Sequence, residues 1–262
     1  MGLDQSTGTD ELRHFSQRTN HLAKKESELV SVLREELPEI SNSFITVDST
    51  KKTTMSDFKR LGAGAGPSPL ARTSVILFHK PKGYLVTRKD EKDRKTVYHI
   101  LPPFLLQEGW VPIGRLDKDS RGLLLFTQDG TLVDRLTAPG GCEKTYEVEI
   151  RGRISDDDLS LVLQGVSTSI GILKVHRVTK KREVGPKTQL EVVLREGKNR
   201  HLRRIFHALK DPKFQTPLKV LDLKRVQIGP LPLDIPVGTW RLSTPDEETQ
   251  LLAIFKIPIP RD

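Results

Sequence analysis

The pattern of apolar and polar side chains changes at about residue 70. Residues 1–70 are rich in Ser, Thr and charge, with one amphipathic segment at 22–37 and a Gly-, Ala- and Pro-rich stretch at 62–69. So little apolar surface cannot offset the entropy lost when a chain becomes ordered. The pattern therefore predicts an N-terminal extension over residues 1–70, disordered or partly helical, joined by a linker to a globular domain over residues 71–262.

Period-two alternation beyond residue 71 predicts strands. Residues 144–151 (Lys-Thr-Tyr-Glu-Val-Glu-Ile-Arg) alternate polar and apolar positions, as a strand with one buried face does. A continuous apolar run at 74–79 is typical of a strand that is buried on both faces. Further strands are predicted over 84–87, 110–113, 123–126, 173–180, 188–194 and 220–228.

Capping residues predict the helices between these strands. We expect helices over 130–136 after Asp129, over 156–163 after Ser155, and over 201–209 after Asn199. Thr244-Pro245-Asp246-Glu247 is a capping box with proline at the first helical position, which predicts a last helix to about residue 255. Strands interspersed with helices predict an α+β fold with a mixed, largely antiparallel sheet flanked by helices.

The charge of the chain is unevenly distributed. Residues 1–70 carry nine basic and ten acidic side chains, which leaves 34 basic and 24 acidic side chains for residues 71–262. The net charge of +9 therefore comes from the predicted globular domain. Such an excess indicates a polyanionic partner such as nucleic acid, and a merely soluble basic surface is the alternative.

Several classes of protein are made less probable by what the sequence contains. Cys142 is the single cysteine and cannot form an internal disulfide. No apolar run approaches the roughly 20 residues that span a bilayer, and the first residues resemble neither a secretory signal nor a transit peptide. The seven His are scattered and suggest no metal site. We expect a soluble, cytoplasmic protein without membrane, metal or cofactor, and a monomer by default.

The first candidate for chemistry is a loop carboxylate, Asp117, between two apolar segments. Arg115 and Lys118 flank it, and nearby positive charge favours an ionised carboxylate at neutral pH. An ionised carboxylate in a fixed position can act as a nucleophile or a base. A turn aspartate that bonds only local backbone donors is the alternative, and Asp119 is a rival two residues further on.

A basic helix and a tyrosine supply the other candidates. The predicted helix at 201–209 has an apolar face, so Arg200, Arg203 and Arg204 lie on its remaining arc, which suits phosphates or pairing with a buried carboxylate. A solvated basic face is the alternative. Tyr146, on the inner face of the strand at 144–151, is either a core residue or a platform on which a base stacks.

Taken together and in this order, these segments resemble the RsuA/RluB/RluE group of pseudouridine synthases over about residues 74–252. Five motifs carry the resemblance: Lys80-Pro81-Lys82-Gly83, the loop at 114–130, Lys144-Thr145-Tyr146, the run Glu196-Gly197-Lys198-Asn199-Arg200 with Arg203-Arg204, and the segments 223–229 and 238–241. Any one match is weak, but five in order are specific. The chain departs from the group at His201, where Gln is usual, and by having no recognisable S4 RNA-binding module in residues 1–70. In the second respect it is similar to the RluE-like members.

The resemblance implies an RNA pseudouridine synthase that isomerises one uridine, most often in ribosomal RNA, without a cofactor. It implies that Asp117 is the catalytic carboxylate, that Tyr146 contacts the target base and that Arg203 pairs with Asp117. Either attack on the sugar or removal of a sugar proton, which gives a glycal-like intermediate, fits a carboxylate. The alternatives are a non-catalytic RNA-binding or ribosome-assembly protein on the same fold, a tRNA-directed synthase, or another enzyme that uses Asp117. Further substrate contacts are predicted at Lys80, Arg115, Lys198, Asn199, Arg200, Arg204 and Leu223.

Overall fold

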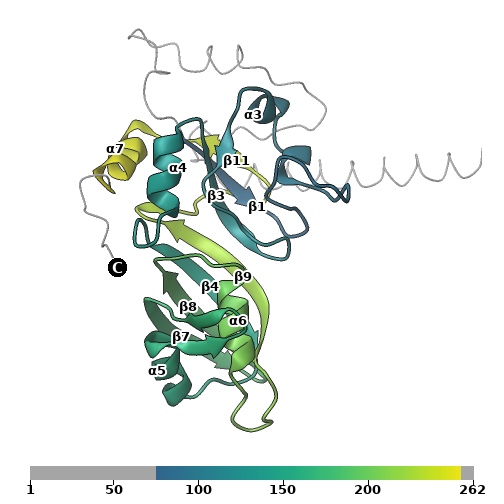
Figure 1. Ribbon diagram of the computed structural model, residues 1–262, viewed down its shortest axis with the longest axis vertical. Helices are drawn as coiled ribbons and strands as arrows, with labels where there is room; N and C mark the ends of the chain where they lie inside the picture. The colour runs from purple at the N-terminus through teal and green to yellow at the C-terminus, as the bar shows by residue number, and fades with distance from the viewer. Residues whose placement is uncertain (1–74, 255–262) are drawn as a thin grey trace, which may run out of the picture. The chain divides into compact units, whose positions relative to one another are not determined.

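The computed structural model describes residues 75–254 of the 262-residue chain. The described strands are β1 (Val75–Lys80), β2 (Val111–Pro112), β3 (Arg121–Thr127), β4 (Lys144–Arg151), β5 (Val166–Thr168), β6 (Gly171–Leu173), β7 (Arg177–Val184), β8 (Lys187–Leu194), β9 (Lys219–Ile228), β10 (Leu231–Pro232) and β11 (Trp240–Leu242). Nine of these form one sheet in the order β11-β1-β3-β9-β4-β8-β7, with β2 beside β3 and β10 beside β9 (Figure 1). β5 and β6 form a separate hairpin.

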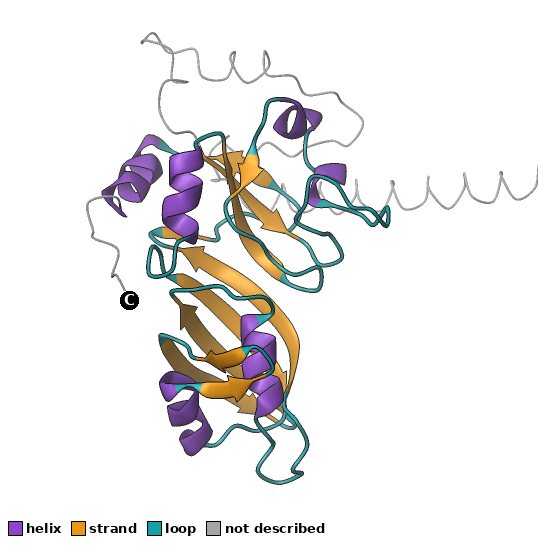
Figure 2. Cartoon of the chain, in the orientation of Figure 1, coloured by secondary structure: helices purple, strands orange, loops and turns teal. Residues whose placement is uncertain are grey.

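The helices of the described region are short and cover the sheet (Figure 2). They are the 3-10 helix η2 (Val97–His99) and the α-helices α3 (Pro103–Gln107), α4 (Gly130–Thr137), α5 (Asp156–Gln164), α6 (His201–Ala208) and α7 (Pro245–Ala253). Asp129 and Ser155 cap α4 and α5 through their side chains, and Thr244 and Glu247 form the predicted capping box of α7. The predicted α+β class is confirmed.

One parallel contact joins the two halves of the large sheet. β1 pairs with β3, and β4 pairs with both β8 and β9, all antiparallel. β3 and β9 run parallel and pair at only two positions, Arg121 with Lys224 and Gly122 with Arg225. The sheet is therefore mixed and largely antiparallel, as predicted. This short contact sets the position of the start of β3 relative to β9 and β4.

Side chains that alternate along the strands build a separate core on each face of the sheet. On β1, Ile76 and Phe78 enter one core, and Val75 and Leu77 enter the other. The first core contains apolar residues of η2, α3, α5 and α6, and the second contains those of α4 and α7. Each Å² of apolar surface that is buried contributes about 25 cal/mol to the free energy of folding, and this contribution stabilises both layers.

Three local predictions are wrong. Residues 84–87 make only an isolated bridge, Leu85 with Thr96, because no neighbouring strand pairs with them. The predicted strand at 173–180 is divided between the end of β6 and the start of β7. Helix α6 is capped not by Asn199 but by Arg200, whose backbone is left-handed and whose side chain makes no capping hydrogen bond.

The predicted extension over 1–70, its helix at 22–37, the linker at 62–69 and the end of the last helix at 255 lie outside the described residues. The boundary at residue 70 stays a prediction. None of the helices between Val75 and Ile254 is long and apolar enough to cross a bilayer.

Candidate active site

Asp117 lies in the segment of residues 113–120 that joins β2 to β3, here called the Asp117 loop. The ammonium of Lys80 donates to the carbonyl oxygens of Asp117 and Ser120, at 3.2 and 2.8 Å. The Gly83 amide donates to the Lys118 carbonyl oxygen at 2.7 Å. The loop backbone is therefore anchored, while the Asp117 side chain remains 24% exposed and accessible to a ligand.

Lys80 is not placed to contact RNA, and that prediction is corrected. The residue is fully buried, and its ammonium donates to a third carbonyl oxygen, that of Pro81, at 3.0 Å. An ammonium has three N–H donors, so none remains for a phosphate. Burial lowers the pKa of Lys80 to about 8, and the charges of Asp117 and Asp119 oppose that shift. Lys80 therefore acts through the Asp117 loop, which it holds in place.

Replacing Lys80 by methionine is expected to lower the free energy of unfolding by about 2–4 kcal/mol, because three carbonyl oxygens lose their donor. Lys82→Met is the matched control. The Lys82 side chain is 46% exposed and its ion pair with Asp222 lies near the surface, so its loss is expected to cost at most about 1 kcal/mol. Urea unfolding measures both values. Equal losses would show that the buried ammonium does not hold the loop.

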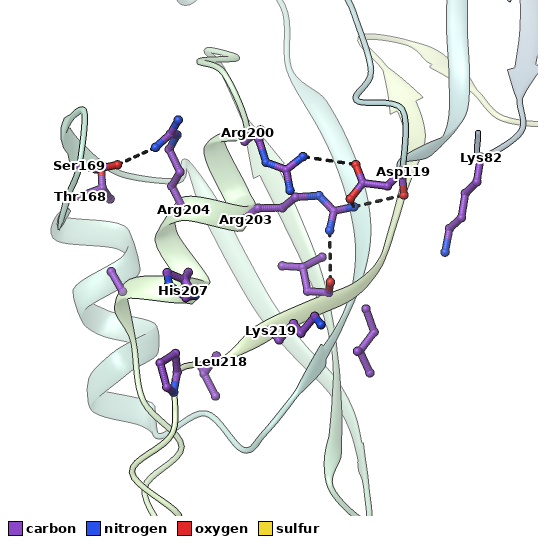
Figure 3. A pocket seen from close by; sticks show the side chains of 14 residues that line it. Lys82, Asp119, Thr168, Ser169, Arg200, Arg203, Arg204, His207, Leu218 and Lys219 are labelled. Carbon is purple, nitrogen blue, oxygen red and sulfur yellow. Dashed lines mark hydrogen bonds and ion pairs between the residues drawn. The ribbon is translucent and has the colours of Figure 1, made fainter. Parts of the chain in front are cut away.

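Helix α6 brings two arginines to the two carboxylates of the Asp117 loop. Arg200 Nη1 lies 3.4 Å from Asp119 Oδ1 and 3.8 Å from Asp117 Oδ2. Arg203 Nη2 lies 3.2 Å from Asp119 Oδ2, and its Nε lies 3.7 Å from Asp117 Oδ2. Figure 3 shows both side chains extending from α6 toward Asp119. Arg203 thus lies beside Asp117, but its shorter contact is with Asp119.

The two arginines differ in how firmly they are held. Arg203 is 11% exposed, and it donates to the carbonyl oxygens of Val220 and Asp119 and to Ser120 Oγ, at 3.2, 3.2 and 3.3 Å. Burial lowers the pKa of the Arg203 guanidinium, and the neighbouring carboxylates, Asp119 first, oppose that shift. Arg200 is 46% exposed, and the hydrogen bond given for its guanidinium is to Asp119. Arg203 is therefore a fixed cation and Arg200 a movable one.

A small cavity of about 80 Å³ opens beside Asp117. Tyr146 of β4 and Leu223 of β9 form part of its wall, and both are almost fully buried, at 7% and 6% exposure. Flat aromatic and apolar walls suit the face of a nucleobase. The lining also includes Leu194, Lys198 and His201.

His201, the departure from the usual Gln, is buried in the first turn of α6. Its Nε2 lies 3.0 Å from the Lys174 carbonyl oxygen. A carbonyl only accepts, so Nε2 must carry the proton in this contact. Burial lowers the pKa of His201, which favours the neutral ring. His201 therefore anchors the start of α6 to the β6–β7 connection.

Two larger grooves flank the Asp117 loop. The α6 groove, of about 870 Å³, lies between α6, the β5–β6 hairpin and the start of β9. The 85–94 groove, of about 740 Å³, lies between residues 85–94 and the Asp117 loop. Of the predicted RNA contacts, Arg204 lines the α6 groove, and Arg115, Lys198 and Asn199 line the 85–94 groove. Arg204 also donates to Ser169 Oγ, at 2.6 Å.

Sequence reasoning missed the part played by Asp119. The sequence presents Asp119 only as a rival to Asp117, yet both arginines make their shorter contacts with it. Two carboxylates two positions apart, opposite a basic helix, were the available signal. That spacing does not say which carboxylate faces which guanidinium, because the loop backbone decides it.

The arrangement can perform carboxylate chemistry. Asp117, beside two guanidinium groups and at the edge of a cavity with an aromatic wall, can attack an electrophilic carbon or take a proton from a bound group. Across residues 75–254, no three His, Cys, Asp or Glu side chains cluster as metal ligands.

Comparison with known proteins identifies a family and several relatives of this chain. Residues 74–208 match the family described as RNA pseudouridylate synthase. A ribosomal large subunit pseudouridine synthase B of Yersinia pestis is 37% identical over 169 residues, which are 63% of this chain and 51% of the relative. The protein of that description from Escherichia coli K12 is 36% identical over 63% of this chain and 55% of its own length. The chain thus spans about half the length of these relatives.

A solved structure supports the fold assignment. The crystal structure of a pseudouridylate synthase superposes with a TM-score of 0.58 at 26% identity, and the match covers 69% of this chain and 74% of that one. The family match covers more than half of the chain and includes the Asp117 loop, Tyr146 and Arg203. On this evidence the chain belongs to the RNA pseudouridylate synthase family.

Proposed function

We propose that this protein is an RNA pseudouridine synthase that isomerises a uridine of ribosomal RNA, with Asp117 as the catalytic carboxylate. One observation carries the proposal. Asp117 lies at the edge of a cavity walled by Tyr146 and Leu223, with the fixed guanidinium of Arg203 3.7 Å from its Oδ2. That combination supplies a carboxylate, a surface for a base and a cation in one place.

The reaction needs only rearrangement of bonds within one nucleotide. The bond between uracil N1 and the sugar C1′ breaks, the base turns, and a bond forms between uracil C5 and C1′. The proton on C5 is lost to water, and N1 takes one up, so atoms and electrons balance without a cofactor. Asp117 either attacks C1′ to hold the sugar or removes the C2′ proton to give a glycal. Both routes need an unprotonated carboxylate at the sugar.

The neighbouring residues have supporting parts in this proposal. A uridine must leave its stack to enter the cavity, which costs a few kcal/mol. Tyr146 receives the freed base against its ring, Leu223 closes the apolar wall, and the guanidinium of Arg203 pairs with the Asp117 carboxylate. The basic residues along the two grooves bind the RNA backbone on either side.

Ribosomal RNA is the proposed substrate class because the relatives are described as ribosomal large subunit pseudouridine synthases. A cytoplasmic location goes with that substrate.

The test is release of tritium from RNA labelled at uridine C5, since the C5 hydrogen is expelled when the new carbon–carbon bond forms. Transcripts of large-subunit rRNA, small-subunit rRNA and tRNA are incubated separately with the full chain. Release from the large-subunit transcript supports the proposal, and release from tRNA alone would change the substrate class. Binding of rRNA without release from any transcript would favour an RNA-binding or assembly protein.

The pKa of Lys80 predicts an alkaline limit to this activity. Above about pH 8 the Lys80 amine is neutral and donates two hydrogen bonds instead of three, so the Asp117 loop loses an anchor and a nearby charge. We expect kcat/KM for tritium release to fall as the pH rises through about 8. In Lys80→Met the remaining activity should lack this step. The same step in both proteins would assign it to another group.

A further inference from the structure

Arg200 occupies a special position, because it lines both grooves and the cavity beside Asp117. Asp119, its partner, lines both grooves. A strand of RNA that passes from one groove to the other while its target base enters the cavity must therefore pass this ion pair. Figure 3 shows the pair at the upper edge of the α6 groove, with Lys82 beyond it.

On the side of the α6 groove, the charge beside this pair is strongly positive. The described residues that line the α6 groove include Lys82, Arg200, Arg203, Arg204 and Lys219, and Asp119 is the one acidic side chain among them. A carboxylate at this point opposes an approaching phosphate. It also neutralises the arginine that is best placed to meet one.

The ion pair between Asp119 and Arg200 is exposed and weak, so another anion can replace Asp119 beside Arg200. Asp119 is 51% exposed, Arg200 is 46% exposed, and their closest oxygen and nitrogen atoms are 3.4 Å apart. Exposed pairs of this kind contribute between nothing and about 1 kcal/mol. Arg203 also touches Asp119, but its bonds to Val220 and Ser120 keep it in place.

The backbone of Arg200 indicates that its place is not incidental. Its φ is 52°, in the left-handed region that non-glycine residues rarely adopt. Such a conformation costs on the order of 1–3 kcal/mol and persists only where the surrounding structure imposes it, and it clusters at functional sites. It turns the chain into α6 so that Arg200 projects over both carboxylates.

We propose that Asp119 holds Arg200 in the RNA-free protein and that a backbone phosphate next to the target uridine takes Arg200 from it. This inference rests on the proposed function, because it names how RNA enters the same site. Arg200 lies 3.8 Å from Asp117 in the free protein. When it turns to the phosphate, Asp117 keeps the fixed guanidinium of Arg203 beside it. RNA binding thereby changes which cations lie beside Asp117.

The test is a double-mutant cycle on RNA affinity, with Asp119→Asn, Arg200→Gln and the double variant. The probe is a fluorescein-labelled RNA hairpin with a uridine in its loop, and anisotropy gives Kd at fixed ionic strength, since affinity depends on salt. Gln has the same left-handed backbone cost as Arg, so that cost cancels. We expect Asp119→Asn to tighten binding about three- to fivefold when Arg200 is present, and by less than about twofold when it is Gln.

Glu91→Gln is the control for charge alone. Glu91 also lines the 85–94 groove, and its replacement by Gln changes the net charge by the same amount as Asp119→Asn does. If Asp119→Asn lowered the Kd for RNA by the same factor with Arg and with Gln at position 200, Asp119 would act only by repelling phosphate. That result would overturn the exchange. Weaker binding by Asp119→Asn would also overturn it. Binding needs no turnover, so coupling without tritium release would refute the enzyme and leave the exchange standing. Tritium release without coupling would support the enzyme and refute the exchange. If the protein bound no RNA, both the enzyme activity and the exchange would be refuted.

Discussion

Asp117→Asn is expected to lower single-turnover tritium release by on the order of 10³-fold or more, because an amide neither attacks the sugar nor accepts its proton. Asparagine has the shape of aspartate and leaves the backbone carbonyl that Lys80 holds unchanged. The fold and the loop should therefore survive, and the loss should appear in kcat rather than in RNA affinity.

Two comparisons make this result specific. Asp119→Asn removes the rival carboxylate, and its effect on kcat should be at least about tenfold smaller, because Asp119 does not line the cavity. Asp157→Asn, on the first turn of α5, removes an exposed carboxylate far along the chain from the site and should leave the rate unchanged. A larger loss at Asp119 than at Asp117 would exchange the two roles.

Gly122→Ala is expected to lower the free energy of unfolding by about 3–5 kcal/mol, the largest stability effect that we predict. Gly122 has a φ of 114°, and a Cβ there would meet the Arg225 carbonyl oxygen and lie 2.5 Å from the Arg225 amide nitrogen. Both atoms belong to the backbone of the parallel β3–β9 contact, which has only two paired positions. Neither strand can yield without breaking that contact.

Gly130→Ala is the matched control, and guanidinium unfolding measures both variants. Gly130 is the first residue of α4, and a Cβ there meets nothing within 4 Å. Alanine favours helix more than glycine does, so this variant should be neutral or more stable by up to about 1 kcal/mol. Similar values for the two variants would mean that β9 moves easily away from β3.

Gly122→Ala should also lower tritium release, because the β3–β9 contact places Asp117 relative to Tyr146 and Leu223.

Local signals in the sequence predicted the elements whose causes are local. The alternation at 144–151 gave β4 with its bounds, since a period of two exposes one face of a strand whatever its partners are. Side-chain caps placed the starts of α4, α5 and α7, because a cap bonds amides two or three residues away. Residues 84–87 failed as a strand because strand formation needs a partner, and local pattern does not supply one.

The candidate site likewise has residues that the sequence predicted and contacts that it did not. Motif order along the chain was enough to name Asp117, Tyr146 and Arg203 as candidates, and their catalytic roles stay predictions. The resemblance of the Lys80-Pro81-Lys82-Gly83 motif made Lys80 a candidate RNA contact, but a motif does not show burial, and this lysine ends a strand that is buried on both faces. Its role depends on carbonyl oxygens as far away in the chain as Ser120.

The sequence by itself therefore determined the fold class, the family resemblance, the caps of α4, α5 and α7 and the identity of the candidate residues, because each depends on a short window or on the order of motifs. Only the tertiary structure decided which groups meet. It placed Lys80 under the Asp117 loop, fixed Arg203 by several hydrogen bonds while leaving Arg200 in an exposed ion pair with Asp119, and put Asp119 between two grooves. These contacts join residues up to about 80 positions apart. They depend on the register of β3 against β9 and on one left-handed residue before α6, and no local pattern encodes either.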